Sequence, residues 1–584
     1  MINKIKENLN KRWNIKFFDE LLNTFNSFSI TEKAIFYTLT FIFCISGIIL
    51  LNSASKATMV NIPASGGELT EGIIGTPRFI NPVLAVSDVD QDLTQLVYSG
   101  LVKISSDNKI VPDLAEYYEI SDDGLEYKFI LRDNAYFHDG KKVTTDDILF
   151  TINKIQDSSI KSPLRPEFYD VQVQANSERE IIFTLKKPYS PFLGNLTVGI
   201  IPKHLWSNLS SEEFPLSQYN LQPIGSGPYK IVDTSTEQKN MLLIPIFYEL
   251  KAFDKYTLGK PYISKLTINF FRDEKSMIDS YNKGDVEAIS SISTDKMELI
   301  KEKSSSEIKK TALPKEFMIF FNQNESEVLT YKEVREALDL AIDKQKLVDT
   351  VLNGYGTILN GPIPSNLQDK KENLNNYDPA KAQEILEKNG WVLSSSTNVL
   401  EKKISKKKTL TLSISISTLS GSSLEKAAEL IKADWEKIGV KTEVKGFDFG
   451  NLEQNIIRPR KFETLLYGLV VGRDMDLFAF WHSSQRNDPG LNIAMYTNSK
   501  VDKILEEARK TRNDSERMEK YLSFEKELLK DTPAIFLYSP EFIYITPKKI
   551  NNLDISKITM PYERFLNINE WFIETNNLWK IFNH

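Results

Sequence analysis

Few residues of this chain have types and spacings that suit catalysis. Residues 137–140 (Phe-His-Asp-Gly) place an imidazole beside a carboxylate, and Asp474-Met475-Asp476 places two carboxylates two positions apart. Asp-Gly is also a turn signal, so we interpret the first motif as a turn between a strand and the segment that follows. Two acids at i and i+2 share a face only in an extended segment. A catalytic role would need a further partner, so we favour contact with solvent or with a ligand amine. A hydrolase that uses Asp474 with His482 stays open as an alternative.

Cofactor and metal motifs are also scarce. Residues 225–228 (Gly-Ser-Gly-Pro) lack the Lys-Ser/Thr of a phosphate loop and precede a strand pattern, so we expect a close approach of two backbone segments there. The sequence contains no G-x-S-x-G, H-E-x-x-H or paired-cysteine motif. It has one cysteine and four scattered histidines, which argues against nickel and other metals. We predict no cofactor and no metal site.

Composition limits the class of protein. The chain has 584 residues, 41% hydrophobic and 26% charged, which predicts a folded protein of several domains. Its formal net charge of -6 gives no electrostatic reason to expect nucleic acid as a partner.

One segment is apolar enough to cross a membrane. Residues 34–52 carry no charge, and at ~1.5 Å per residue they span about the thickness of a bilayer core. Six lysines and arginines precede residue 34, against four acidic residues. The positive-inside rule therefore predicts that residues 1–33 are cytoplasmic and that the bulk of the chain is extracytoplasmic. A cleaved signal peptide and lipidation at Cys44 are the alternatives to this single-pass anchor.

Beyond the anchor, strand and helix patterns alternate. Residues 53–66 are small and polar and predict a flexible linker, and the lysine-rich residues 401–408 predict a solvated hairpin loop. Residues 410–416, 424–438 and 440–444 read as strand, helix and strand, a βαβ unit that requires a partly parallel sheet. The other clear patterns predict strands at 127–131, 181–185 and 534–546, and helices at 333–352, 379–389, 500–510 and 515–530.

Several motifs in a constant order resemble the family 5 extracellular solute-binding proteins, the peptide- and nickel-binding subunits of bacterial ABC importers. The resemblance runs from about residue 66 to residue 547. No single motif is specific to this family, but the order in which the motifs follow one another is specific to it. The motifs are Gly67-Glu68-Leu69, Phe79-Ile80-Asn81-Pro82, residues 97–102, Pro112-Asp113-Leu114, residues 121–132, residues 137–140, Gly225-Ser226-Gly227-Pro228, residues 334–343 and Tyr377-Asp378-Pro379.

The resemblance implies an α/β, two-lobed periplasmic-binding-protein fold with mixed sheets, a hinge between the lobes and one N-terminal transmembrane helix. We expect a first lobe at residues 67–310 that contains a family-specific subdomain at about 111–222. A second lobe is expected at 311–540, with residues 541–584 returning to the first lobe. The implied function is capture of an oligopeptide-like ligand in the interlobe cleft, without catalysis, by a monomer that delivers it to the permease subunits of an ABC importer. A surface sensor or adhesion protein on the same fold, and a binder of a non-peptide solute, are the alternatives.

The resemblance also implies a set of ligand-binding candidates. Family peptide binders commonly place an aspartate for the ligand amine where this chain has Val471 or Gly472, and its own acids, Asp474 and Asp476, come slightly later. Phe449 and Arg458 correspond to an aromatic and an arginine of some members, with a core position and a surface charge as their alternatives. The remaining candidates are Phe79, Asn81, Arg473 and Trp481, of which Trp481 either walls the cleft or lies in the core.

Overall fold

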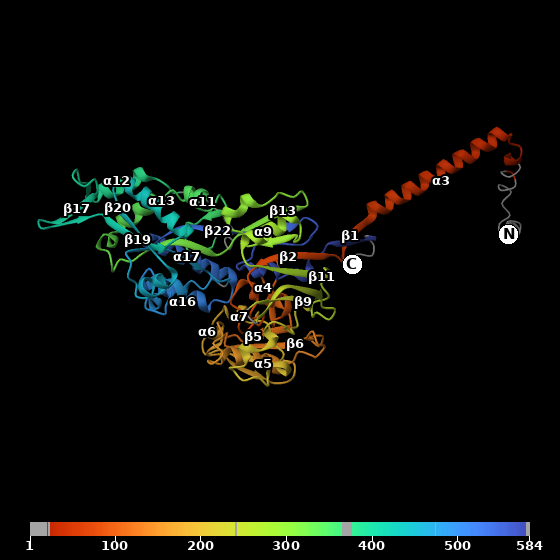
Figure 1. Ribbon diagram of the computed structural model, residues 1–584, viewed down its shortest axis with the longest axis horizontal. Coiled ribbons are helices and arrows are strands. Elements are labelled where there is room, and N and C mark those ends of the chain that lie inside the picture. Colours follow the sequence, from red (N-terminus) through yellow and green to blue (C-terminus); the bar gives the residue numbers. More distant parts are fainter. Residues whose placement is uncertain (1–19, 21–23, 240–241, 365–375, 474, 580–584) are drawn as a thin grey trace. The chain divides into compact units, whose positions relative to one another are not determined.

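The computed structural model describes residue 20 and residues 24–239, 242–364, 376–473 and 475–579 (Figure 1). The chain divides into two compact units. One consists of residues 1–64 and 574–584, and the other of residues 65–573. Most of the predicted cytoplasmic segment, and Asp474, lie outside the described residues.

The first unit contains one long helix and a two-stranded ribbon. Helix α3 (Ile30–Thr58) begins where Glu32 accepts hydrogen bonds from the backbone N–H and the hydroxyl of Ser29, both at 2.8 Å. A 21-residue window of it, Ile30–Leu50, has a mean hydropathy of 1.9 and none of it is buried. Strand β1 (Met59–Ala64) pairs antiparallel with β23 (Glu574–Trp579). The sequence predicts a linker at residues 53–66. Its first residues continue α3, and the next six pair with a strand about 500 positions away.

The second unit is organised around one large mixed sheet. Its longest strand, β22 (Ala534–Pro547), pairs with β14 through its first half and with β12 and β13 through its second half. We call the part around β2 and β9–β13 the first lobe and the part around β14 and β19–β21 the second lobe; β22 belongs to both. The strands of this sheet are β2 (Glu68–Ile74), β9 (Tyr229–Lys239), β10 (Leu242–Ala252), β11 (Lys265–Phe271), β12 (Ala288–Ser290), β13 (Ser306–Ala312), β14 (Lys315–Phe321), β15 (Gly356–Ile358), β19 (Ser413–Leu419), β20 (Lys441–Phe447) and β21 (Thr464–Val470).

The core of the first lobe contains residues from near both ends of the second unit. Leu69 from β2 and Phe542 and Tyr544 from β22 belong to the same buried cluster as Trp571. A four-stranded sheet, β5-β6-β8-β7, extends this lobe, and Phe129 and Phe183 pack edge to face across it at 5.8 Å. Its elements are β5 (Ala115–Ile120), β6 (Glu126–Leu131), β7 (Gln172–Ala175), β8 (Glu180–Thr184) and the covering helix α5 (Thr145–Gln156).

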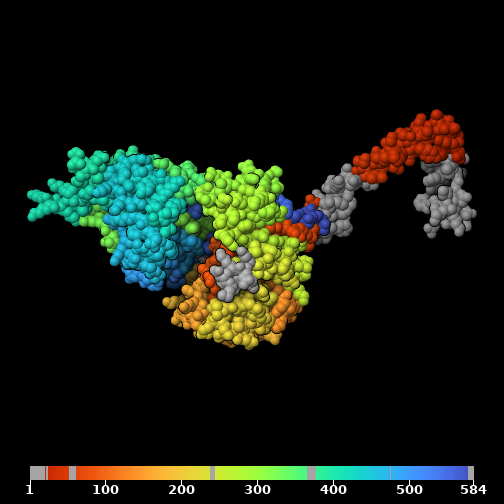
Figure 2. Space-filling model, viewed as in Figure 1, coloured from red at the N-terminus to blue at the C-terminus, as the bar shows by residue number. Residues whose placement is uncertain are grey.

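The second lobe has a core on each face of its sheet. Ile319 and Phe321 of β14 point into one core, and Met318 and Phe320 point into the other, as strand alternation requires. Residues of the second lobe, coloured green to blue, form one continuous surface in the space-filling view (Figure 2). The helices of this lobe are α10 (Lys332–Leu340), α11 (Lys344–Val351), α12 (Pro379–Lys388), α13 (Ser423–Lys437), α16 (Ser499–Lys510) and α17 (Asp514–Asp531).

Most predicted elements of the exterior are present. The βαβ unit is confirmed, because β19 and β20 pair in parallel around α13. The close approach at residues 225–228 is also confirmed: a Cβ on Gly225 would lie 2.0 Å from the carbonyl oxygen of Val97. Residues 401–408 do form a hairpin, but most of them belong to its strands, β17 (Leu400–Ser405) and β18 (Lys408–Thr411).

Two predicted elements are interrupted. The helix expected at 333–352 divides into α10 and α11, because the Asp343 carboxylate accepts a hydrogen bond from the Lys346 N–H at 3.0 Å and starts a second helix. The strand expected at 410–416 divides at the buried Leu412, where the chain leaves the hairpin sheet and enters the main sheet.

Candidate functional site

Two cavities of the second unit have walls from both lobes. Cavity I, of about 370 Å³, is lined by helix α4 (Asp88–Val97) and the residues after it, by residues 194–199 and 559–566, and by Gly472 and Arg473 of the second lobe. Cavity II, of about 530 Å³, lies between the first-lobe segments 108–127 and 190–193 and the second-lobe segments around Arg473 and the start of α17. Arg473 lines both cavities, so they adjoin at this side chain.

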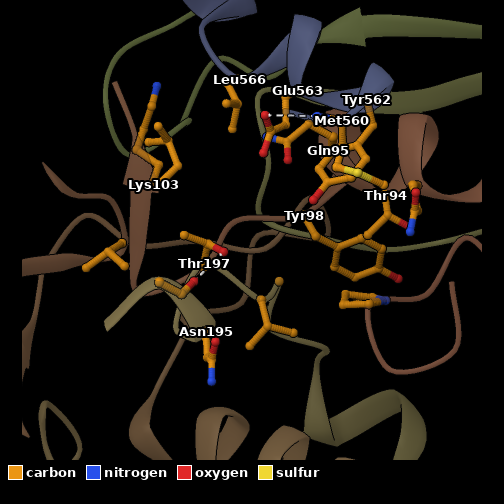
Figure 3. A pocket seen from close by; sticks show the side chains of 18 of the residues that line it. Thr94, Gln95, Tyr98, Lys103, Asn195, Thr197, Met560, Tyr562, Glu563 and Leu566 are labelled. Atoms are coloured by element: carbon orange, nitrogen blue, oxygen red, sulfur yellow. Dashed lines mark hydrogen bonds between the residues drawn. The ribbon is translucent and has the colours of Figure 1, made fainter. Parts of the chain in front are cut away.

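Helix α4 supplies one wall of cavity I. Its N-terminus is capped by Ser87, whose hydroxyl accepts a hydrogen bond from the Asp90 N–H. Gln91, Thr94 and Gln95 are three and four positions apart and therefore share the face that lines the cavity. Figure 3 shows Thr94, Gln95 and Tyr98 beside Met560, Tyr562 and Glu563, with Asn195 and Thr197 opposite them.

Several polar atoms of cavity I lack a protein partner. The Thr94 and Tyr98 hydroxyls and the Asn195 Nδ2 are buried, and none has a hydrogen-bond partner among the described residues. An unsatisfied buried polar group costs about 1–3 kcal/mol. Three such groups around one cavity indicate that a ligand, or water that a ligand displaces, completes their hydrogen bonding.

A buried cation and a buried acid lie in the same wall. Lys103 donates a hydrogen bond to Asn569 Oδ1 at 3.2 Å, and burial lowers the pKa of its ammonium group. Burial raises the pKa of the Asp113 carboxyl to about 6, although the nearby Lys103 opposes this shift.

Arg473 connects the lobes at the junction of the cavities. Its guanidinium donates to the Glu563 carboxylate and, at 3.4 Å, to the backbone carbonyl of Lys557. Glu563 is held in turn by the Thr559 hydroxyl, which donates at 3.0 Å. The side chains of Arg473 and Glu563 are only 14% and 7% exposed, so this ion pair is shielded from solvent.

A fully buried ionic network fixes the first-lobe walls of cavity I. The guanidinium of Arg564 donates to Asp92 on α4 at 2.6 Å and to Glu71 on β2 at 2.9 Å. The Tyr544 hydroxyl donates to Glu71 at 2.8 Å. Burial raises the pKa of the Asp92 carboxyl to about 6, with Arg564 acting in the opposite direction. The network joins α4 to residues 559–566, two neighbouring segments that both line cavity I.

Further contacts between the lobes lie beside cavity II. Asp476 accepts hydrogen bonds from Arg509 at 2.6 Å and from the Tyr189 hydroxyl at 3.3 Å. Arg517 donates to the Ser190 hydroxyl at 2.7 Å, and Arg512 donates to the backbone carbonyl of Ser121. The bonds of Tyr189, Ser190 and Ser121 join first-lobe residues outside the strands of the subdomain sheet to the second lobe.

The predicted site residues do not form one cluster. Arg473 lines both cavities, and Asp476 lies beside cavity II in an ion pair with Arg509. Trp481 is 2% exposed and packs against Phe320 and Phe536, so it occupies the core rather than a cavity wall.

The other predicted residues lie outside the lining of both cavities. Phe79 packs against the first-lobe core, and the buried Asn81 donates to Asn220 Oδ1 at 3.1 Å. Phe449 is 63% exposed, and the exposed Arg458 pairs with Glu453 at 3.3 Å.

The side chains considered for catalysis or metal binding lie in turns and packing contacts of the fold. Gly140 has a φ of +89°, and its N–H donates to the Phe137 carbonyl at 2.9 Å, which confirms the predicted turn. His482 stacks on Phe478 at 3.9 Å, and its Nδ1 lies 2.8 Å from the Ser484 hydroxyl. Among the described residues, no three His, Cys, Asp or Glu side chains gather where they could hold a metal ion.

Sequence reasoning missed Thr94, Tyr98 and Asn195. Thr94 and Tyr98 follow Leu93 and Val97 in an amphipathic helix and its exit, where polar residues normally face solvent. The only available signal was their position in and beside the motif at residues 97–102, and this motif does not show which neighbours are buried.

Comparisons with known proteins agree with this architecture. Residues 109–515 match the family model described as bacterial extracellular solute-binding proteins, family 5 middle. The oligopeptide-binding protein AppA of Bacillus subtilis (strain 168) is 26% identical over 537 residues, which cover 89% of this chain and 94% of the relative.

Two solved structures extend the likeness to three dimensions. The substrate-binding protein CtaP of Listeria monocytogenes has 27% identity and a TM-score of 0.71, covering 87% of this chain and 99% of its own. NikZ of Campylobacter jejuni, solved with Ni(L-His), has 28% identity and a TM-score of 0.64, covering 86% and 99%. The predicted two-lobed fold is confirmed, and the chain belongs to family 5 of the bacterial extracellular solute-binding proteins.

Proposed function

We propose that this chain captures a peptide-like solute between its lobes and passes it unchanged to the permease of an ABC importer. The observation that carries the proposal is the pair of adjoining cavities with walls from both lobes, one of which holds three buried polar groups without protein partners. The relative from Bacillus subtilis is named an oligopeptide-binding protein. An extended peptide suits such walls, because its amides donate and accept hydrogen bonds along their whole length.

Binding and lobe closure depend on the same residues. Arg473 of the second lobe and Glu563 of the first bond to each other at the junction of the cavities. A ligand that contacts both walls stabilises the closed arrangement by its differential affinity for it. Closure would then present a loaded surface to the permease, as in hinge-closing binding proteins.

We also propose that α3 anchors the chain in the cell membrane, with the second unit outside as a monomer. Support comes from the apolar window Ile30–Leu50 and from the basic residues before it. The domain boundaries expected from the sequence stay predictions, and the shared core of Leu69 and Trp571 supports a return of the last segment to the first lobe.

Thermal unfolding of the full chain in detergent tests the ligand class. A peptide at a hundred times its Kd stabilises the folded chain by about 2.7 kcal/mol. Pools of short peptides are expected to raise the unfolding temperature. The opposite result, no shift with peptides but a shift with a nickel–histidine chelate or a sugar, would favour the non-peptide alternative.

Matched tyrosine variants test whether cavity I is the binding site. Tyr98→Phe removes one unpartnered buried hydroxyl and is expected to weaken peptide binding by about 0.5–1.5 kcal/mol. Tyr117→Phe changes a tyrosine that is 46% exposed and lines neither cavity, so binding should be unchanged. Equal effects of the two variants would remove cavity I from the site.

A surface sensor would bind the same peptides, but their uptake by cells would not depend on the chain.

A further inference from the structure

A lysine-rich hairpin projects from the end of the second lobe (Figure 1). Its strands β17 and β18, together with β16 (Trp391–Leu393), form a small sheet separate from the main sheet. The space-filling view shows the hairpin standing out from the surface of the lobe (Figure 2). Residues 400–411 contain five lysines and one acid, so the hairpin is basic in a chain whose net charge is -6.

Two of these lysines hold the hairpin to the lobe. The ammonium of Lys402 lies 5.6 Å from the ring centre of the buried Trp391 and donates to Glu333 at 2.9 Å. Lys408 pairs with Glu327 at 2.5 Å. The other three lysines are exposed and have no carboxylate at ion-pair distance among the described residues, namely Lys403, Lys406 and Lys407.

The fold does not require lysine at these three positions. Lysine on an edge strand discourages pairing with another chain, but Lys403 lies on β17, the central strand of the small sheet. Lys406 and Lys407 form the turn, where asparagine and glycine are the favoured residues. Neighbouring like charges repel one another, and a partner of opposite charge relieves this repulsion.

An apolar side chain lies among the unpaired lysines. Ile404 is 40% exposed on β17, directly after Lys403 and two positions before Lys406. At a membrane surface, long lysine side chains extend their charged ends to the headgroups while an apolar side chain enters the boundary below them. The hairpin therefore combines the two interactions by which a peripheral segment adsorbs to anionic lipid.

The rest of the chain favours lipid over an acidic protein as the partner. The proposed anchor α3 holds the chain at a membrane and so raises the local concentration of headgroups. An anionic leaflet repels a body of net negative charge and attracts its basic tip, which orients the body. An acidic protein surface matches the charge but offers no acyl boundary for Ile404.

We propose that residues 403–408, the hairpin tip, dock on the anionic lipid surface of the membrane in which the chain is anchored. The tip is a second, reversible membrane contact, and its residues line neither cavity I nor cavity II. The inference goes beyond solute capture and rests on the proposed anchor.

Quenching of a fluorescent label at the tip tests the proposal. Cys44→Ala with Ser405→Cys leaves the full chain one thiol, at the tip, for the label. The chain is reconstituted into phosphatidylcholine vesicles, with or without phosphatidylglycerol, that contain a lipid with a nitroxide near its headgroup. Quenching is expected only with phosphatidylglycerol. About 1 M salt should abolish it, because the Debye length falls to about 3 Å.

Matched lysine variants test the role of charge. Lys403→Gln with Lys406→Gln and Lys407→Gln should lower the ratio of docked to undocked tip about a hundredfold, at about fivefold for each lysine near an anionic surface. Changing three exposed lysines of α16 and α17 removes the same net charge and should leave the quenching unchanged; this control is Lys503→Gln, Lys510→Gln and Lys526→Gln. Equal losses in the two triple variants would show that only net charge matters, and would overturn docking by the tip.

The outcomes distinguish the anchor from the docking tip. If the chain does not float with vesicles of either composition, the proposed anchor fails and docking fails with it. If it floats but its label is not quenched with phosphatidylglycerol, the anchor stands and docking is overturned. A label that responds to soluble polyglutamate but not to phosphatidylglycerol would assign the tip to an acidic protein, which also overturns the proposal.

Discussion

Replacing Arg564 by methionine should be severely destabilising, because this guanidinium is the partner of two buried carboxylates. Its side chain is 0% exposed, and those of Glu71 and Asp92 are 1% and 3% exposed. Breaking a buried ionic network by removing one partner costs about 3–5 kcal/mol, since the remaining charges stay desolvated. The free energy of unfolding of Arg564→Met should therefore fall by that amount at neutral pH.

The pH dependence of the stability lost in Arg564→Met is a second, independent test of the same reasoning. Burial raises the pKa of the Asp92 carboxyl in the folded chain to about 6, and loss of the Arg564 cation removes the interaction that opposes this rise. Protonation relieves the charge, so the deficit of Arg564→Met is small near pH 5 and grows as the pH rises towards 8. Urea unfolding at both pH values, followed by tryptophan fluorescence, measures this difference.

Two controls test the reasoning. Arg179→Met removes an arginine that is 40% exposed and pairs with Glu116 and Asp133, and should cost less than about 1 kcal/mol. Adding Glu71→Gln and Asp92→Asn to Arg564→Met should recover much of the lost stability. A deficit below about 1 kcal/mol, or one that does not change with pH, would refute the view that uncompensated buried charge dominates at this network.

Three other changes probe single positions of the fold. Glu316→Gln should stabilise the chain more at pH 8 than at pH 5, as measured by urea unfolding. Burial raises the pKa of Glu316, so the folded chain must keep this acid protonated as the pH rises, which costs stability in the wild type. Equal gains at the two pH values would contradict this reasoning. Gly225→Ala should lower the free energy of unfolding by about 1–3 kcal/mol in the same assay, because the added Cβ would clash with Val97. Gly450→Ala is the control and should cause no such loss, because the atom nearest to its added Cβ is 3.5 Å away. Asp343→Ala should cost about 1 kcal/mol through the lost cap of α11, and no loss would argue against a separate helix there.

Local signals in the sequence predicted most elements of the fold. The Asp378-Pro379 pair starts α12, and Gly439 at a φ of +84° ends the α13 region, because capping chemistry depends on residues a few positions apart. The same reasoning failed at Asp343, which lies inside an otherwise continuous helical pattern and becomes a cap only because the chain turns there.

The candidate site was less predictable, because its walls come from distant segments. Helix α4, residues 194–199, Arg473 and residues 559–566 meet only in the folded chain. Arg473 was identified through its place in the family-like order. Trp481, chosen on the same basis, turned out to be buried against Phe320. Aromatic residues follow the same spacing in a cleft wall and in a core, so residue type alone does not separate the two.

The pairing of β1 with β23 has a mechanical consequence for a chain held in a membrane by α3. Ala64 lies opposite Glu574, so both peptide links to residues 65–573 leave the ribbon at the same end. Each strand of the ribbon has six residues and spans about 20 Å. Both links are therefore held together by the same six residue pairs of the ribbon. A chain tethered to a membrane in this way has a raised effective concentration at a membrane partner without any added affinity.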